Sequence, residues 1–167
     1  MRVRARLRLA LLGAALVGAC ERPAPSTPDE RPAPAVVVSD RYVVRQSARA
    51  FPETLSALFE ALDRRDLTVF AVVDHAAAAQ GAGLELPPTT LVLFGDPEVG
   101  TPLMVAVPLV GEELPLRALV YERDGEVFLA VTGIANLSRR YALGEEQDVL
   151  DRTGRMLAEV ADEVTRP

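Results

Sequence analysis

The order of two hydrophobic patterns limits the fold more than any other feature of this 167-residue chain. Between Phe51 and Arg65, leucine and phenylalanine recur at spacings of three and four, which predicts an amphipathic helix. An almost unbroken apolar run of strand length follows directly, from Leu67 to Val73. Such a run is typical of a strand covered on both faces, so we expect it in the centre of a sheet.

The alternation of strands and helices continues after this run. Asp74 can cap a helix that starts at His75, because an aspartate side chain accepts hydrogen bonds from free helical N–H groups. Thr89 to Phe94 is a second apolar strand, and Gly95-Asp96-Pro97 ends it. Here aspartate is again a natural cap, and proline fits the first position of the next helix.

The C-terminal half predicts a hairpin and a final helix. The strands Arg117 to Arg123 and Glu126 to Thr132 flank Asp124-Gly125, a strong two-residue hairpin signal. Valine, leucine and methionine then follow one side of a helix from Val149 to Val164. Together these segments predict an α+β fold: one domain with a mixed sheet of four or five strands, packed by helices and closed by a C-terminal helix.

The N-terminal residues predict an address rather than part of the fold. Four arginines and a short apolar run precede Gly18-Ala19-Cys20, in the order of a secretory signal, and the segment resembles a bacterial lipobox. We predict a signal peptide over residues 1–19, a lipidated Cys20, and a tether over residues 20–35 that contains five prolines. The domain then occupies residues 36–167, with its first strand near VVV and YVVR. An ordinary signal peptide with a free cysteine is the alternative.

This reading places the protein in the bacterial cell envelope, anchored to a membrane through lipid. Glu21 stands where many inner-membrane lipoproteins have aspartate, which favours the outer membrane and a domain that faces the periplasm. The apolar run is too short for a membrane-spanning helix, which needs about 20 residues.

Charge and composition exclude several functions. The first 19 residues hold four of the 18 basic residues and none of the 24 acidic ones, so the mature chain would carry a net charge of −10. A surface this acidic disfavours nucleic acid as a partner. The chain has no lysine, which excludes a Schiff base, and its one cysteine excludes an internal disulfide and a thiolate zinc site.

Four segments in order carry a resemblance to a known family: FPETLSALFEAL, VFAVVDHAAAA, PPTTLVLFGDPEVGTPLM and LPLRALVYERDGEVFLAV. From about Arg41 to its end, the chain resembles domain-of-unknown-function family 302, which often has asparagine where this chain has Asp96. The resemblance implies a compact α+β domain that can pair as a homodimer, and it implies no general activity.

The candidate site combines the two places where a strand is followed by a helix. If the two strands are neighbours, we expect both turns to share one edge of the sheet and to form a shallow pocket, because strand ends that feed helices often bind ligands. The candidate residues are Asp74, His75, Phe94, Gly95, Asp96, Pro97 and Met104. The alternative is that both aspartates are only helix caps and that His75 has no function.

Three functions remain open from the sequence. The first is binding of a small ligand or an envelope protein without turnover. The second is a metal- or haem-assisted redox accessory or enzyme that uses His75, the only histidine, with Met104 as a second haem ligand or a second copy of His75 for a metal. The third is a structural homodimer with no ligand. No catalytic residue is predicted, because nothing marks a nucleophile near His75.

Overall fold

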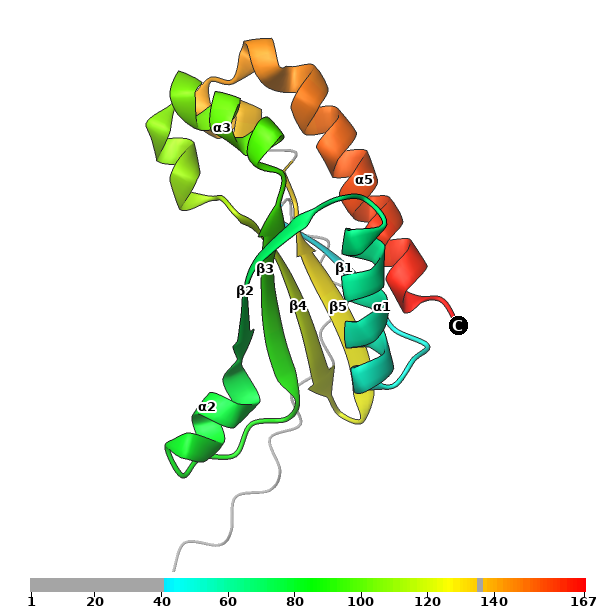
Figure 1. The fold of residues 1–167 in the computed structure, drawn as a ribbon. Coiled ribbons are helices and arrows are strands. Elements are labelled where there is room, and N and C mark those ends of the chain that lie inside the picture. The colour runs from blue at the N-terminus through cyan, green and yellow to red at the C-terminus, as the bar shows by residue number, and fades with distance from the viewer. Residues whose placement is uncertain (1–40, 135–136) are drawn as a thin grey trace, which may run out of the picture. The chain divides into compact units, whose positions relative to one another are not determined.

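The computed structural model describes residues 41–134 and 137–167 (Figure 1). The predicted signal peptide, Cys20 and tether lie outside the described residues. Five strands form one sheet in the order β1-β5-β4-β3-β2, and every neighbouring pair is antiparallel. The strands are β1 (Tyr42–Gln46), β2 (Thr68–Asp74), β3 (Thr89–Gly95), β4 (Leu116–Arg123) and β5 (Glu126–Thr132). The helices are α1 (Phe51–Asp63), α2 (His75–Gly81), α3 (Pro97–Ala106), α4 (Leu137–Tyr141) and α5 (Gln147–Thr165), with 3₁₀ turns η1 (Pro108–Glu112) and η2 (Gly144–Glu146).

The predicted α+β class, the five-stranded sheet and the C-terminal helix are confirmed. The sheet is entirely antiparallel in the described residues, whereas we expected a mixed sheet. The predicted hairpin joins β4 to β5, and its two turn residues, Asp124 and Gly125, have φ values of 54° and 79°. Positive φ at both positions suits the twist of a two-residue hairpin, which explains the glycine.

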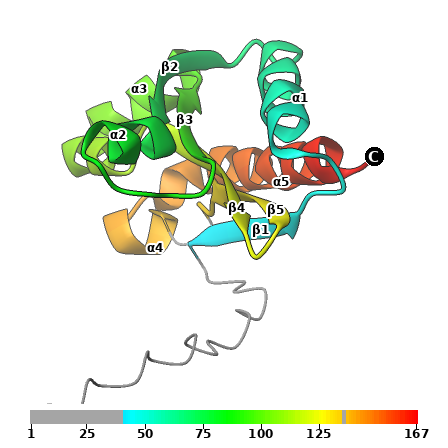
Figure 2. The ribbon, with the colours of Figure 1, turned by 90° about the horizontal axis from the view of Figure 1, so that it is seen from below.

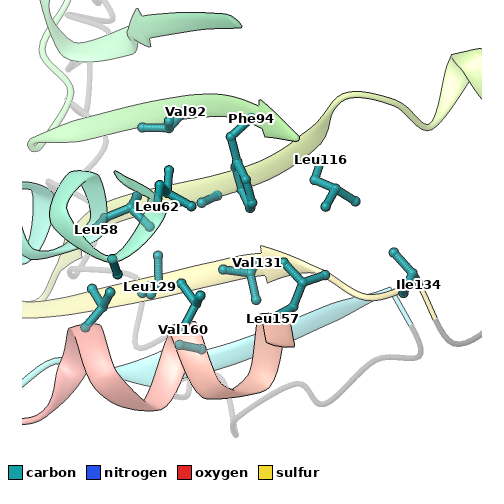
Figure 3. Packing of buried hydrophobic residues seen from close by; sticks show 14 of the residues in the cluster. Leu58, Leu62, Val92, Phe94, Leu116, Leu129, Val131, Ile134, Leu157 and Val160 are labelled. Atoms are coloured by element: carbon teal, nitrogen blue, oxygen red, sulfur yellow. The ribbon is translucent and has the colours of Figure 1, made fainter. Parts of the chain in front are cut away.

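The core lies between one face of the sheet and the pair α1 and α5, which lie side by side (Figure 2). Because side chains alternate along a strand, Val92 and Phe94 of β3 and Leu129 and Val131 of β5 all point to this face and are fully buried. Leu58 and Leu62 of α1 and Leu157 and Val160 of α5 meet them (Figure 3). The opposite face carries half-exposed residues, among them the stacked pair Tyr121 and Phe128.

Ion pairs join the two helices of this layer to each other and to the sheet. Glu163 of α5 accepts hydrogen bonds from Arg64 and, at 2.7 Å, from Arg65 at the end of α1. These arginines, Arg65 first, hold the pKa of the Glu163 carboxyl below its usual value. Asp162 of α5 accepts a hydrogen bond of 2.8 Å from Arg45 of β1. The polar rim of α5 therefore fixes the helix over the sheet.

The prediction that Leu67 to Val73 forms a central strand is wrong. The segment is a strand, but β2 is the last strand of the sheet, and all seven of its residues are exposed. The helices α1 and α5 pack mainly on β1, β5 and β4, and every residue of β2 remains exposed (Figure 1). Among the described residues, no helix combines the length and apolar character needed to span a membrane.

Candidate functional site

An apolar pocket of about 370 Å³ lies where β3 passes into α3. Its walls come from the start of β2, from α3, from the segment before β4, and from α5. The lining residues are Leu67, Phe70, Gly95, Asp96, Pro97, Val99, Gly100, Thr101, Leu103, Met104, Leu114, Pro115, Leu116, Ile134, Leu137, Leu150, Thr153 and Met156. Asp96 is the single charged residue in this set. Pockets of about 300–1,000 Å³ with mostly apolar walls are the usual size for small-molecule sites.

The turn that opens α3 positions the predicted part of this pocket. Asp96 caps the helix, because its Oδ1 atom accepts a hydrogen bond of 2.8 Å from the backbone N–H of Glu98. Pro97 is the first residue of α3, as expected. Gly95, Asp96, Pro97 and Met104 all line the pocket. The structure therefore brings four of the seven candidate residues together, with the capping role of Asp96 fulfilled in the same place.

Close approach between α3 and the segment before β4 shapes the opposite wall. A Cβ atom at Gly100 would lie 3.4 Å from the Leu114 side chain, and one at Gly111 would lie 3.5 Å from the sulfur of Met104. Phe70 borders the pocket from β2, where the register with β3 shifts between Val69 and Ala71. The irregular register places Phe70 near Gly95, at the side of the pocket that β2 provides.

Phe94, Asp74 and His75 do not belong to this pocket. The side chain of Phe94 points into the hydrophobic core and is fully buried there (Figure 3). Asp74 caps α2 by accepting a hydrogen bond of 2.9 Å from the N–H of Ala77. The expectation that both turns share one edge is wrong, because β2 and β3 are neighbours but antiparallel, so Asp74 pairs with Thr90 while Gly95 pairs with Thr68.

The two helices that follow these turns accordingly lie at opposite ends of the sheet (Figure 1). Seven strand residues span about 20 Å, so His75 and Met104 are too far apart to bind one haem iron within a chain. Among the described residues, no group of three or more histidine, cysteine, aspartate or glutamate side chains is placed to bind a metal ion.

His75 instead borders a wider groove on the face of the sheet that α1 and α5 leave uncovered. This groove has a volume of about 1220 Å³, and its floor includes Leu91, Leu119 and Ala130 from three neighbouring strands. His75 is half-buried at its edge. His75 therefore lines a cavity that shares no residue with the apolar pocket.

A charge cluster stands next to the pocket and anchors the segment before β4. Glu113 accepts hydrogen bonds from Arg140 Nη1 at 2.8 Å and from the Tyr141 hydroxyl at 3.1 Å, and Arg117 Nη2 lies 3.7 Å from its other oxygen. The Arg140 hydrogen bond is the main cause that lowers the pKa of Glu113, and partial burial acts against it. Leu114, the next residue, lines the pocket, so this cluster fixes one of its walls.

Sequence reasoning missed most of the pocket walls. Leu67, Phe70, Leu114, Ile134 and Met156 come from segments far apart in the chain, and each reads locally as an ordinary core residue. The one local signal was the strand end followed by Asp96-Pro97. Nothing in the sequence shows which distant segments pack around that turn.

A solved structure shares this fold. The crystal structure of an uncharacterized conserved DUF302 protein from Bacillus stearothermophilus superposes with a TM-score of 0.67 at 18% sequence identity. The match covers 74% of this chain and 97% of that one. At this identity the likeness concerns the fold.

Curated relatives in Brucella have higher identity but are longer. Fluoride-specific ion channel FluC 1 of Brucella suis biovar 1 (strain 1330) is 39% identical over 119 residues, which make up 71% of this chain and 47% of that protein. The protein of the same name from Brucella abortus biovar 1 (strain 9-941) is also 39% identical, over 44% of its length. This chain thus spans less than half the length of these relatives.

The model of one protein family matches residues 43–164, which is nearly the whole described domain. The family is described as domain of unknown function DUF302. The matched range begins in β1 and ends in the last turn of α5, so it includes the sheet, the helical layer and every wall of the pocket. Sequence, fold and family model agree, and the chain belongs to the DUF302 family.

Proposed function

We propose that this domain binds a small apolar molecule in the pocket between β2, α3 and α5. The observation that carries the proposal is the pocket itself: about 370 Å³ with apolar walls from segments far apart in the chain. Removing apolar surface from water stabilises a structure by about 25 cal/mol per Å², and the exposed walls of an open pocket lack this stabilisation. A ligand that covers these walls would recover that stabilisation.

The lining also limits the chemistry of the ligand. Asp96 is the one charged residue at the pocket, and the hydroxyls of Thr101 and Thr153 are the other side-chain polar groups there. The Thr153 hydroxyl already donates to the carbonyl of Val149 at 2.8 Å. An uncharged molecule such as a short acyl chain or a small aromatic compound fits these walls, whereas an anionic fatty acid would meet the Asp96 carboxylate.

Photolabelling of the full chain tests this function. An uncharged alkyl diazirine probe is bound, activated by light, and its attachment sites are mapped by peptide mass spectrometry. We expect labels on peptides from α3 and α5. Thr101→Phe should remove most of this labelling, because Thr101 is an exposed residue at the pocket and an aromatic ring there would obstruct it.

The matched control is Val105→Phe, which adds the same ring to the same helix at a residue that is 78% exposed and does not line the pocket. Labelling should persist in this variant. Equal labelling of the wild type and Thr101→Phe, or labelling of exposed apolar residues elsewhere with none in α3 and α5, would contradict the proposal.

We also propose that the protein works from a lipid anchor in the cell envelope. The support is the order of arginines, apolar run and Gly18-Ala19-Cys20 in the sequence, followed by the proline-rich residues up to 35. Mass spectrometry of the membrane form should find an N-terminal Cys20 that carries diacylglycerol. An N-terminus at another residue, or an unmodified Cys20, would contradict the anchor.

The Brucella relatives favour a second candidate function, contact with a membrane protein. Those proteins are named fluoride-specific ion channels, and a region similar to this domain makes up less than half of each. A domain joined to a channel in one polypeptide is held close to it. Cross-linking in native membranes should then capture one recurring membrane protein, and cross-links confined to the chain itself would argue against this function.

A further inference from the structure

The face of the sheet opposite α1 and α5 carries a row of apolar residues. Four strands contribute one residue each, and the pairing register places them side by side: Val44, Ala130, Leu119 and Leu91. Each of the four is only partly buried. The solvated face of an antiparallel sheet is normally polar. A ligand that covers this row would therefore remove apolar surface from water.

The row forms the floor of the groove of about 1220 Å³ that His75 borders. Neighbouring strands lie about 4.8 Å apart, so a row across four strands is about 14 Å long. Along β4, Tyr121 lies two residues to one side of Leu119 and Arg117 two residues to the other, and both line the groove. Because side chains two residues apart share a face, the groove has an apolar floor with a cationic side.

The charged lining of the groove is rich in arginine. It consists of Arg41, Arg117, Arg139, Arg140, Glu112 and Glu113. Four arginines thus face two glutamates, in a chain whose net charge is −6. A concave surface lined by an excess of one charge attracts ligands of the opposite charge. The ligand that suits this groove is therefore an anion with an apolar body.

Arg117 is the residue best placed to bind such an anion. Its backbone N–H donates to Thr132 Oγ1 at 2.9 Å, and this hydroxyl donates to the Arg117 carbonyl at 3.1 Å, which fixes the residue on the sheet. Arg117 Nη2 lies 3.7 Å from Glu113, too far for a hydrogen bond. Glu113 already accepts from Arg140 at 2.8 Å. One carboxylate therefore faces two guanidinium groups, and a second carboxylate would balance the charge.

We propose that this groove binds a small carboxylic acid with an apolar body. The carboxylate accepts hydrogen bonds from the Arg117 guanidinium, whose planar fork matches two carboxylate oxygens. The body lies on Leu119 and its neighbours in the row. The groove shares no residue with the apolar pocket, so this proposal does not depend on the function proposed for that pocket.

Isothermal titration calorimetry of the full chain with butyrate, hexanoate and octanoate tests the proposal. The affinity should rise by up to about fourfold with each added methylene, because the longer body covers more of the floor. Arg117→Gln should weaken octanoate binding by about tenfold or more, since it removes a charged donor to the carboxylate.

Arg123→Gln is the matched control. It makes the same substitution in the same strand, at a side chain that is 37% exposed, compared with 41% for Arg117, and that does not line the groove. Octanoate binding should persist in this variant. It should also persist in Thr101→Phe, which obstructs the apolar pocket and so separates the two sites.

Four results would overturn the proposal. They are a wild type that does not bind octanoate, an affinity that does not rise with chain length, equal binding by the wild type and a folded Arg117→Gln variant, and loss of octanoate binding in Thr101→Phe. Binding of an octaglutamate peptide without binding of octanoate would also overturn it, because the groove would then recognise an acidic protein segment.

The salt dependence of the wild type keeps the test decisive if Arg117→Gln fails to fold. Raising the ionic strength from about 0.01 M to about 0.1 M shortens the range of electrostatic attraction from about 30 Å to about 10 Å. Octanoate binding that relies on the arginines should weaken several-fold over this range. An affinity that stays constant or rises with salt would rule out the cationic site.

Discussion

Glu113→Gln measures how much stability the domain gains from the charge cluster beside the pocket. The glutamine keeps the shape and one acceptor oxygen of Glu113 but removes its charge. In the wild type the carboxylate accepts from Arg140 at 2.8 Å and from Tyr141 at 3.1 Å. Since these contacts join the end of η1 to α4, the variant should loosen the connection between the two segments.

The expected loss follows from how far each partner is buried. The Glu113 side chain is 17% exposed and the Arg140 side chain is 39% exposed. A hydrogen bond to a charged group contributes about 1.5–3 kcal/mol when well buried, and an exposed ion pair contributes about 0–1 kcal/mol. This half-buried cluster lies between the two, at about 1 kcal/mol. In a domain of this size, that loss lowers Tm by about 3–6 °C.

The effect should depend on pH with a definite sign. The Arg140 hydrogen bond, opposed by burial and supported by the Tyr141 hydroxyl, holds the pKa of Glu113 below its ordinary value of 4.5. A group whose pKa is lowered by folding stabilises the fold fully above its unfolded pKa, and the contribution is lost as the pH falls through its folded pKa. The difference between wild type and variant should thus be constant near neutral pH and vanish in acid.

Urea denaturation followed by circular dichroism, repeated from neutral to acidic pH, gives the free energy of unfolding needed for this comparison. Glu112→Gln is the control, because Glu112 is an exposed glutamate in the same turn and its loss should change stability by less than about 0.5 kcal/mol. The reasoning fails if both variants lose the same stability, or if the Glu113→Gln deficit persists unchanged in acid.

Two further predictions concern backbone geometry and capping. Gly125→Ala should lower the free energy of unfolding by about 1–2 kcal/mol, because Gly125 has a φ of 79° in the hairpin turn. Gly81→Ala should not lower it, since a Cβ atom there meets no other atom within 4 Å. Thermal denaturation that finds the two variants equally stable would contradict this prediction. Asp96→Ala should cost about 1 kcal/mol through loss of the α3 cap, and Asp96→Asn should retain most of that stability. Calorimetry that finds the asparagine variant as unstable as the alanine variant would show that Asp96 acts in some other way.

Local signals in the sequence predicted the elements of this fold well. The helical spacing of Leu58 and Leu62, the Asp124-Gly125 turn and the caps at Asp74 and Asp96 depend on neighbours within a few residues. Interactions between residues so close in the chain can be predicted from the local sequence. For this reason α1, α2, α3 and the β4–β5 hairpin appear where they were expected.

Local signals could not predict the position of β2 in the sheet. An apolar run shows that a strand avoids charge, but it does not show how many strands lie beside it. The order of strands is set by pairings between distant segments, such as β3 with β4. The residues from Val69 to Val73 are apolar although β2 is the last strand of the sheet and is exposed, so their composition resembles that of a central strand.

Only the local part of the candidate site was predicted correctly. Gly95, Asp96, Pro97 and Met104 belong to one turn and the helix after it, and they do line one pocket. Asp74 and His75 were grouped with them on the assumption that both strands point the same way. The direction of β3 relative to β2 depends on the connection through α2 and the residues after it, and this connection turns the chain back on itself.

The pairing of β1 with β5 has a consequence for how the domain is made. Tyr42 in the first strand lies opposite Thr132, and the backbone N–H of Ala48 donates to the carbonyl of Thr165 at 2.9 Å. The first strand therefore has no sheet partner until most of the chain has been synthesised, and contacts between such distant segments form slowly. A nascent chain that stops before α5 lacks Leu157 and Val160 and exposes the apolar residues that they cover. Such shortened products should be cleaved readily by proteases, and the domain should close only once α5 has left the ribosome.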